Sequence, residues 1–125
     1  DEHIEVAGIA IIGREDRSAG KKRKPIQELA EGIDRTTPLI VMDHQPFKLE
    51  EAVNVGADVQ LSGHTHHGQL WLLNFITKKV YELSWGKLKK GNTHSYVSCG
   101  AGSWGPPVRL GNTPEIMQIK LIFTG

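Results

Sequence analysis

The sequence of 125 residues predicts an α/β fold in which parallel strands alternate with helices. Two observations support this prediction. Segments of strand length occur at residues 4–12, which is rich in β-branched residues, at 39–42, which is fully apolar, and at 57–61. The segments between them carry apolar residues at helical spacing. There are no internal repeats and no linker. Residues 1–125 are therefore interpreted as one domain, or as one part of a domain.

The first predicted strand covers residues 4–12 and ends at Gly13. Residues 14–24 follow as a polar stretch with six basic and two acidic residues. One interpretation of this stretch is a solvated loop, and the other is a basic lip that attracts anionic substrates. Pro25 suits the first turn of a helix. The next apolar residues have helical spacing: Ile26, Leu29, Ala30 and Ile33.

A short apolar run, Leu39–Met42, predicts a central strand that ends in Asp43 and His44. A second short helix is expected around residues 49–53, closed by Gly56. Residues 57–61 form the next predicted strand. The loop that follows places His64, His66 and His67 between two glycines, in the string Leu-Ser-Gly-His-Thr-His-His-Gly-Gln of residues 61–69.

Histidines follow two successive strands of this predicted sheet. In open α/β sheets, ligands bind beyond the carboxyl ends of the strands, so His44, His64 and His66 should meet at one rim. Imidazole is the commonest protein ligand for zinc and also suits iron, copper and nickel. The sequence therefore predicts that this rim is part of a metal site.

The second half has a less regular pattern. A helical stripe is expected from Leu72, Phe75, Ile76, Val80 and Leu83, although residues 80–83 could equally form a strand. Residues 95–99 predict a strand, and residues 100–105 a glycine-rich loop. A closing strand with one mostly polar face is expected at the end, from the alternation of Met117, Ile119, Leu121 and Phe123 with their neighbours.

Composition excludes some classes of function. The net charge of +1 gives no argument for a nucleic-acid partner. No apolar run reaches the length of a transmembrane helix. The single cysteine, Cys99, cannot form an internal disulfide and is expected to be a small buried apolar residue.

The two histidine motifs resemble a known family. His44-Gln45-Pro46 and Gly63-His64-Thr65-His66 resemble the fourth and fifth motifs of the calcineurin-like metallophosphoesterases, an isolated His and then Gly-His-x-His. The longer string Gly-His-Thr-His-x-Gly-Gln resembles the bacterial YkuE-like phosphodiesterase branch. Residues 97–116 resemble the C-terminal stretch of that branch, through Ser-x-Gly-x-Gly-x-Trp-Gly-Pro-Pro-x-Arg and then Pro-Glu-Ile.

This resemblance implies hydrolysis of phosphodiesters or phosphomonoesters by two divalent metal ions (Mn, Fe or Zn), with His44 and His64 on one metal and His66 on the other. Trp104 and Arg109 lie in or just after the glycine-rich loop. We expect Trp104 to line the cleft and Arg109 to contact the phosphate, because a guanidinium suits bidentate phosphate contacts. For Trp104 the alternative is structural packing, and for Arg109 it is a surface ion pair. His67 stands where that branch usually carries glycine.

Three earlier motifs of the family are missing: Asp-x-His, Gly-Asp-x-x-Asp and Gly-Asn-His-Asp/Glu. We therefore expect the chain to be the C-terminal half of a sandwich of two sheets flanked by helices, inactive by itself, with the N-terminal half as its missing partner. Self-association through the uncovered sheet is expected, and a membrane-anchored or extracytoplasmic parent is plausible. The alternative is a stand-alone or degenerate metal-binding or assembly module without catalysis.

Overall fold

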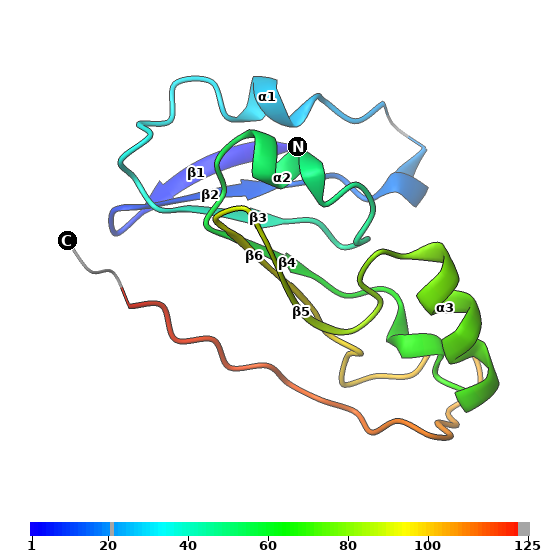
Figure 1. Cartoon of the computed structure of the whole chain (residues 1–125). Coiled ribbons are helices and arrows are strands. Elements are labelled where there is room, and N and C mark those ends of the chain that lie inside the picture. Colours follow the sequence, from blue (N-terminus) through cyan, green and yellow to red (C-terminus); the bar gives the residue numbers. More distant parts are fainter. Residues whose placement is uncertain (21, 123–125) are drawn as a thin grey trace.

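The computed structural model describes residues 1–20 and 22–122, and it confirms an α/β fold (Figure 1). Its sheet has six strands in the order β1-β2-β3-β4-β6-β5. The strands are β1 (Glu2–Val6), β2 (Ile9–Gly13), β3 (Leu39–Met42), β4 (Val59–Ser62), β5 (Gly86–Lys90) and β6 (Thr93–Val97). The α-helices are α1 (Ile26–Leu29), α2 (Glu50–Asn54) and α3 (Asn74–Val80), and 3-10 turns occupy η1 (Arg17–Ala19), η2 (His66–Gly68) and η3 (Trp71–Leu73).

The centre of the sheet has the predicted parallel arrangement. Strands β2, β3, β4 and β6 are parallel neighbours, so their carboxyl ends reach the same edge. Helices α1 and α2 lie on the same side of the sheet (Figure 1). They enclose the core, in which the apolar residues of alternate strand positions meet those of the helices: Ala10, Ile12, Leu39, Val41, Ile26, Leu29, Ala52 and Ala57.

The single strand predicted over residues 4–12 is wrong. The chain turns at Ala7 and Gly8, which both have positive φ, and β1 pairs with β2 as an antiparallel hairpin. Glycine adopts this left-handed backbone without steric cost, which makes Gly8 suited to a tight turn. The apolar run is continuous through the turn, so hydrophobicity alone could not reveal it.

The helix expected to reach Ile33 is also shorter than predicted. It ends at Leu29, and Gly32 adopts a left-handed φ of 81° that turns the chain away. Ile33 still packs against the core, from the loop. The helical spacing of Ile33 therefore correctly indicated a partly buried side chain, although this residue is not part of the helix.

The closing strand predicted from Met117 is absent from the described residues, which end at residue 122; Phe123 lies outside them. Met117, Ile119 and Leu121 are half-buried and their neighbours are exposed, so the predicted alternation of faces is present. No strand of the described residues pairs with this segment, which explains why it is extended without belonging to a sheet. In Figure 1 it runs on the side of the sheet opposite to α1 and α2.

The sheet face opposite to α1 and α2 is only partly covered. Ile4, Val6 and Met42, which the strand register places on this face, are each about half exposed. The second sheet of the expected sandwich does not occur among residues 1–20 and 22–122. In the same part of the chain, no helix has the length and apolarity needed to cross a membrane.

Candidate metal centre

The predicted histidines meet at the carboxyl edge of the parallel strands. His44 follows β3 and His64 follows β4, and their ring centroids are 5.1 Å apart with the rings nearly perpendicular. A cavity of about 390 Å³ is lined by His44, His64 and His66 together with Trp104. The structure thus brings three predicted ligands and one predicted substrate-binding residue to the same cavity.

The loop that carries the histidines has an unusual backbone. His64, His66, His67 and Gln69 all have φ between 46° and 66°, in the left-handed region that non-glycine residues rarely adopt. Such a concentration is typical of functional sites, where the surrounding structure holds a strained conformation. Gly68 is required, because a Cβ there would lie 2.5 Å from the backbone of Leu73 and Asn74.

Hydrogen bonds hold this backbone in place. The Thr65 hydroxyl donates to the carbonyl of Ser84 at 2.6 Å and accepts from the His67 N–H at 3.1 Å. The Asn112 amide donates to the carbonyl of His66 at 2.9 Å. The spacer between the two metal-ligand candidates is therefore a buried positioning residue, and the loop is held from two distant parts of the chain.

Gln69 connects the histidine loop to the loop that contains Trp104. Its buried amide donates to the carbonyls of Trp104 at 2.8 Å and Pro106 at 3.1 Å, and its side-chain oxygen accepts from the Trp104 N–H. Trp104 itself is 70% exposed, so it lines the cavity without being packed in the core. Sequence reasoning noticed Gln69 only as part of a motif and missed this role.

Arg109 does not line the cavity and lies beside His66. Its Nη2 is 3.2 Å from His66 Nδ1 and donates to the carbonyls of Cys99 and Gly100 at 2.9 and 3.0 Å. Its Nη1 donates to the side chain of Asn112 at 3.3 Å. The guanidinium therefore holds the glycine-rich loop against His66, and the predicted phosphate contact stays a prediction.

The pKa values of His64 and His66 are lowered, which favours their neutral form. Burial, followed by the charge of His44, lowers the pKa of His64, and burial followed by the charge of Arg109 lowers the pKa of His66. A neutral imidazole has the free lone pair that a metal ligand needs. Both side chains are therefore ready to bind a metal near neutral pH.

One carboxylate reaches the same region. Asp16 accepts hydrogen bonds from the Ser18 N–H at 2.7 Å and from Gln45 at 3.4 Å. The Ser18 backbone contact is the main cause of the lowered pKa of Asp16, and the charges of His44 and His64 add to it. This negative charge near the two imidazoles has no motif spacing in the sequence and could not be found there.

Asp43 forms an ion pair and a turn contact beside His44. It accepts from Arg23 Nη2 at 2.6 Å, in a largely buried ion pair, and from the Gln45 N–H at 3.3 Å. Arg14 in the same basic stretch pairs with Asp1 and Glu51. Arg23 of the predicted lip thus stabilises the loop that carries His44, and Arg14 stabilises contacts with Asp1 and with α2.

His67 lies outside the cavity of the other three histidines. Its ring packs against Trp85 with centroids 5.2 Å apart, beside a cavity of about 440 Å³ that Cys99 and Glu115 also line. Cys99 is buried, as predicted, and its thiol donates to the Thr113 carbonyl at 3.2 Å. Burial raises the pKa of Cys99, which argues against a nucleophilic thiolate.

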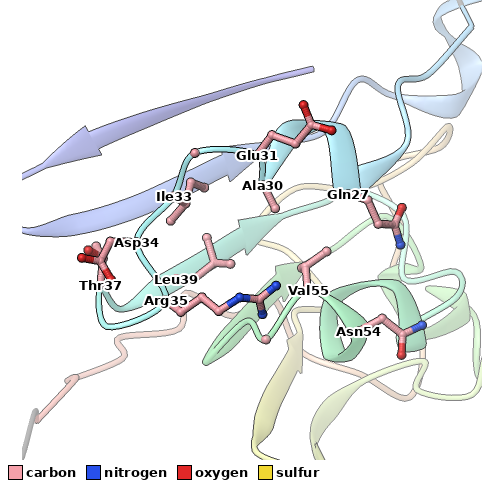
Figure 2. Close-up of a pocket in the computed structure, with 12 residues that line it drawn as sticks. Gln27, Ala30, Glu31, Ile33, Asp34, Arg35, Thr37, Leu39, Asn54 and Val55 are labelled. Atoms are coloured by element: carbon pink, nitrogen blue, oxygen red, sulfur yellow. The ribbon is translucent and has the colours of Figure 1, made fainter.

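A third cavity, of about 540 Å³, lies at the opposite edge of the sheet, between the end of α1 and the end of α2 (Figure 2). Figure 2 shows Arg35 extending along it from the loop that precedes β3. Its lining contains neither histidine nor cysteine. This cavity therefore lacks the imidazole donors that line the cavity at the carboxyl edge.

The histidine set fits a divalent metal as a partial ligand set. The three side chains offer nitrogen donors around one cavity, but within residues 1–20 and 22–122 no group of three His, Cys, Asp or Glu side chains is arranged to hold an ion by itself. A dinuclear site also needs carboxylate ligands to balance its charge. The structure therefore supplies imidazoles and leaves the remaining ligands to be provided from elsewhere.

Comparison with known proteins identifies the class. The chain is 33% identical over 129 aligned residues, 98% of its length, to a metallophosphoesterase of Helicobacter pylori. It is 37% identical to the metallophosphoesterase YkuE of Bacillus subtilis, over 68% of its length. A bovine protein named as a transmembrane protein with a metallophosphoesterase domain is 34% identical over 77% of the chain. No family model and no solved structure matches the chain.

The chain belongs to the metallophosphoesterase family. It spans about a third of the length of the Helicobacter and Bacillus relatives, 34% and 31%. This coverage agrees with a portion of a longer metallophosphoesterase, which was the expectation from the missing motifs.

Proposed function

We propose that the chain supplies the imidazole ligands of a two-metal phosphoesterase, and that it is the C-terminal half of the catalytic domain. The observation that supports this most is the shared cavity of His44, His64 and His66, at the ends of two adjacent parallel strands. In this proposal His44 and His64 bind one metal and His66 binds the other. The metals are Mn, Fe or Zn.

When bound, a pair of divalent metals activates water and neutralises the charge of the phosphoryl group in an in-line displacement. The residues of this chain do the positioning. Uncharged imidazoles add no negative charge that would repel a phosphate. Arg109 holds the loop of His66, Gln69 fixes the loop of Trp104, and Trp104 shapes the cavity wall next to the substrate.

In this proposal Asp16 places a negative charge near the histidine ligands without binding a metal itself. The charges of His44 and His64 help to lower the pKa of Asp16, and Gln45 connects it to the His44 loop. A carboxylate in that position favours cation binding. The other carboxylate ligands would come from the N-terminal half, which also supplies the second sheet of the sandwich.

The experiment compares the chain alone with a longer protein that also carries the preceding half of the domain. With Mn²⁺ and bis(p-nitrophenyl) phosphate, we expect no turnover by the chain alone and turnover by the longer protein. His64→Ala and His66→Ala in the longer protein should each reduce turnover by more than about 100-fold, because a lost ligand costs more than a lost supporting residue. His94→Ala, an exposed histidine on β6, is the matched control and should leave turnover unchanged.

Turnover by the chain alone would overturn the partial-site proposal. A longer protein whose turnover is unaffected by His64→Ala would overturn the ligand assignment. Tight stoichiometric metal uptake by the chain alone, without hydrolysis in the longer protein, would favour the rival function, a metal-binding or assembly module. Two vertebrate relatives are named transmembrane proteins with a metallophosphoesterase domain. On this basis we propose that the longer protein is associated with a membrane.

A further inference from the structure

Exposed apolar side chains gather beside the histidine cavity. The described residues contain fourteen large apolar side chains that are exposed, and eight of these lie in residues 71–80 and 104–110. Those that matter here are Trp71, Leu72, Phe75, Ile76, Val80 and Trp104, exposed by 55–70%. We call residues 71–80 and 104–110 the apolar flank.

The two segments of the apolar flank form one surface. Gln69 binds the backbone of Trp104 and Pro106, and Leu70 pairs with Leu110 in an isolated bridge. A Cβ on Gly111 would lie 2.6 Å from Trp71 Cβ, so the backbone of the second segment touches the first. The flank is thus fixed to the histidine loop, and Ile76 and Trp104 also line its cavity.

The helix in the flank has no buried side chain. Neither η3 nor α3 contributes a buried residue, although most of their residues are apolar. An amphipathic helix normally buries its apolar face against its own protein. Large exposed apolar patches on a soluble domain mark an interaction site, so the natural contact of this face lies outside residues 1–20 and 22–122.

Charge indicates the kind of contact. Residues 71–80 and 104–110 contain Lys78, Lys79 and Arg109 and no acidic residue. Lys78 and Lys79 are both exposed at the end of α3. Tryptophan, phenylalanine and leucine beside lysine are the composition of helices that lie in the interface of anionic lipid layers.

We propose that the apolar flank docks on an anionic lipid layer and that the histidine cavity acts on a phosphoester with an apolar chain held in that layer. The substrate part of this proposal rests on the proposed function, and the docking part does not. Phe75 and Leu72 would enter the layer, Lys78 and Lys79 would contact lipid phosphates, and the phosphoester head group would reach His64 and His66 past Ile76 and Trp104.

The test is cosedimentation of the chain with vesicles of phosphatidylcholine, with and without phosphatidylglycerol. We expect binding to the anionic vesicles that weakens with salt. A Leu72→Ser/Phe75→Ser variant should weaken this binding at least about tenfold, and Lys78→Gln/Lys79→Gln should remove most of the preference for anionic lipid. All four side chains are exposed, so folding should be retained, and circular dichroism checks this.

The matched control is Ile4→Ser/Met42→Ser, which removes two equally exposed apolar side chains from the sheet face and should leave vesicle binding unchanged. No vesicle binding, or equal loss in the control, overturns the docking proposal. So does an oligomer that Leu72→Ser/Phe75→Ser dissociates, because the flank would then be covered by a second copy. In the longer protein, vesicle binding that survives His64→Ala while turnover disappears separates docking from catalysis.

Discussion

Left-handed backbone is concentrated at single residues of the histidine loop. His64, His66, His67 and Gln69 are not glycines, so each adopts this conformation against the preference of its Cβ, at about 1–2 kcal/mol per residue. Hydrogen bonds that the side chains of Thr65, Gln69 and Asn112 donate to backbone carbonyls offset the cost. The site is thus a strained loop held by its neighbours.

His67 offers a direct test of this strain. Its φ of 47° lies in the left-handed region, which glycine adopts without steric cost. His67→Gly and His67→Ala both lose the packing on Trp85, but only alanine keeps a Cβ. Glycine also gains entropy in the unfolded chain, which opposes part of the relief.

We therefore expect His67→Gly to be more stable than His67→Ala by about 0.5–1 kcal/mol, the strain relief less the entropy of glycine. Urea unfolding of the two variants measures the difference. Equal stabilities, or a more stable alanine variant, would show that position 67 is not strained. Gly13, whose φ is not positive, is the control position, and Gly13→Ala should not show this cost.

At the scale of elements, Glu115 fastens the C-terminal segment to the end of β6. One carboxylate oxygen accepts from the Trp85 ring N–H and the Cys99 N–H, both at 2.9 Å, and from Ser98 at 3.3 Å. Burial acts to raise the pKa of Glu115, but these hydrogen bonds favour the ionised form and the net pKa is lowered from its ordinary value of 4.5.

This lowered pKa predicts how stability depends on pH. The folded pKa lies below the unfolded one, so the contribution of Glu115 is complete above pH 4.5 and is lost as pH falls through the folded pKa. Glu115→Gln should remove this part of the acid dependence, and Glu31→Gln, an exposed carboxylate on the loop after α1, should not. Unfolding free energy measured from pH 7 to pH 3 checks this; parallel curves for wild type and Glu115→Gln would refute it.

Strands were predictable from the sequence where the local pattern of apolar residues agrees with the pairing of strands in the folded sheet. The strand at 39–42 follows from an apolar run that ends in polar residues, and the delivery of His44 and His64 to one edge follows from the alternation of strands with helices. The hairpin at Ala7 and the unpaired segment after Met117 were not predictable, because a strand is defined by its partner and the sequence does not show the partner. For the same reason the contact of Arg109 with His66, 43 positions apart, left no local signal.

For the whole molecule, the open sheet face predicts self-association of the chain. Ile4, Val6 and Met42 expose apolar surface on a face that the proposed N-terminal half would cover. Light scattering should show a mass that rises with concentration, and Val6→Thr/Met42→Gln should shift the molecule toward monomer. Val80→Thr on α3 is the control and should have no effect. A monomer at every concentration would contradict this prediction.

The outer edge of the sheet is protected in a different way. Strand β5 carries Lys87, Lys89 and Lys90 along the edge beyond β6, and lysines on an edge strand discourage pairing with another chain. Pairing of another strand with β5 is thus disfavoured. Self-association is expected through the open face of the sheet instead.

The parallel pairing of β4 with β6 has a consequence for the order of folding. Val59 lies opposite His94, so the pairing closes a loop of about 35 residues that contains the histidine loop and α3. Contacts between such distant positions form only after the chain has lost much of its freedom, whereas the β1–β2 hairpin can form early. Trp104, which follows β6, also lines the histidine cavity, so the complete cavity forms only after this loop has closed and is a late product of folding.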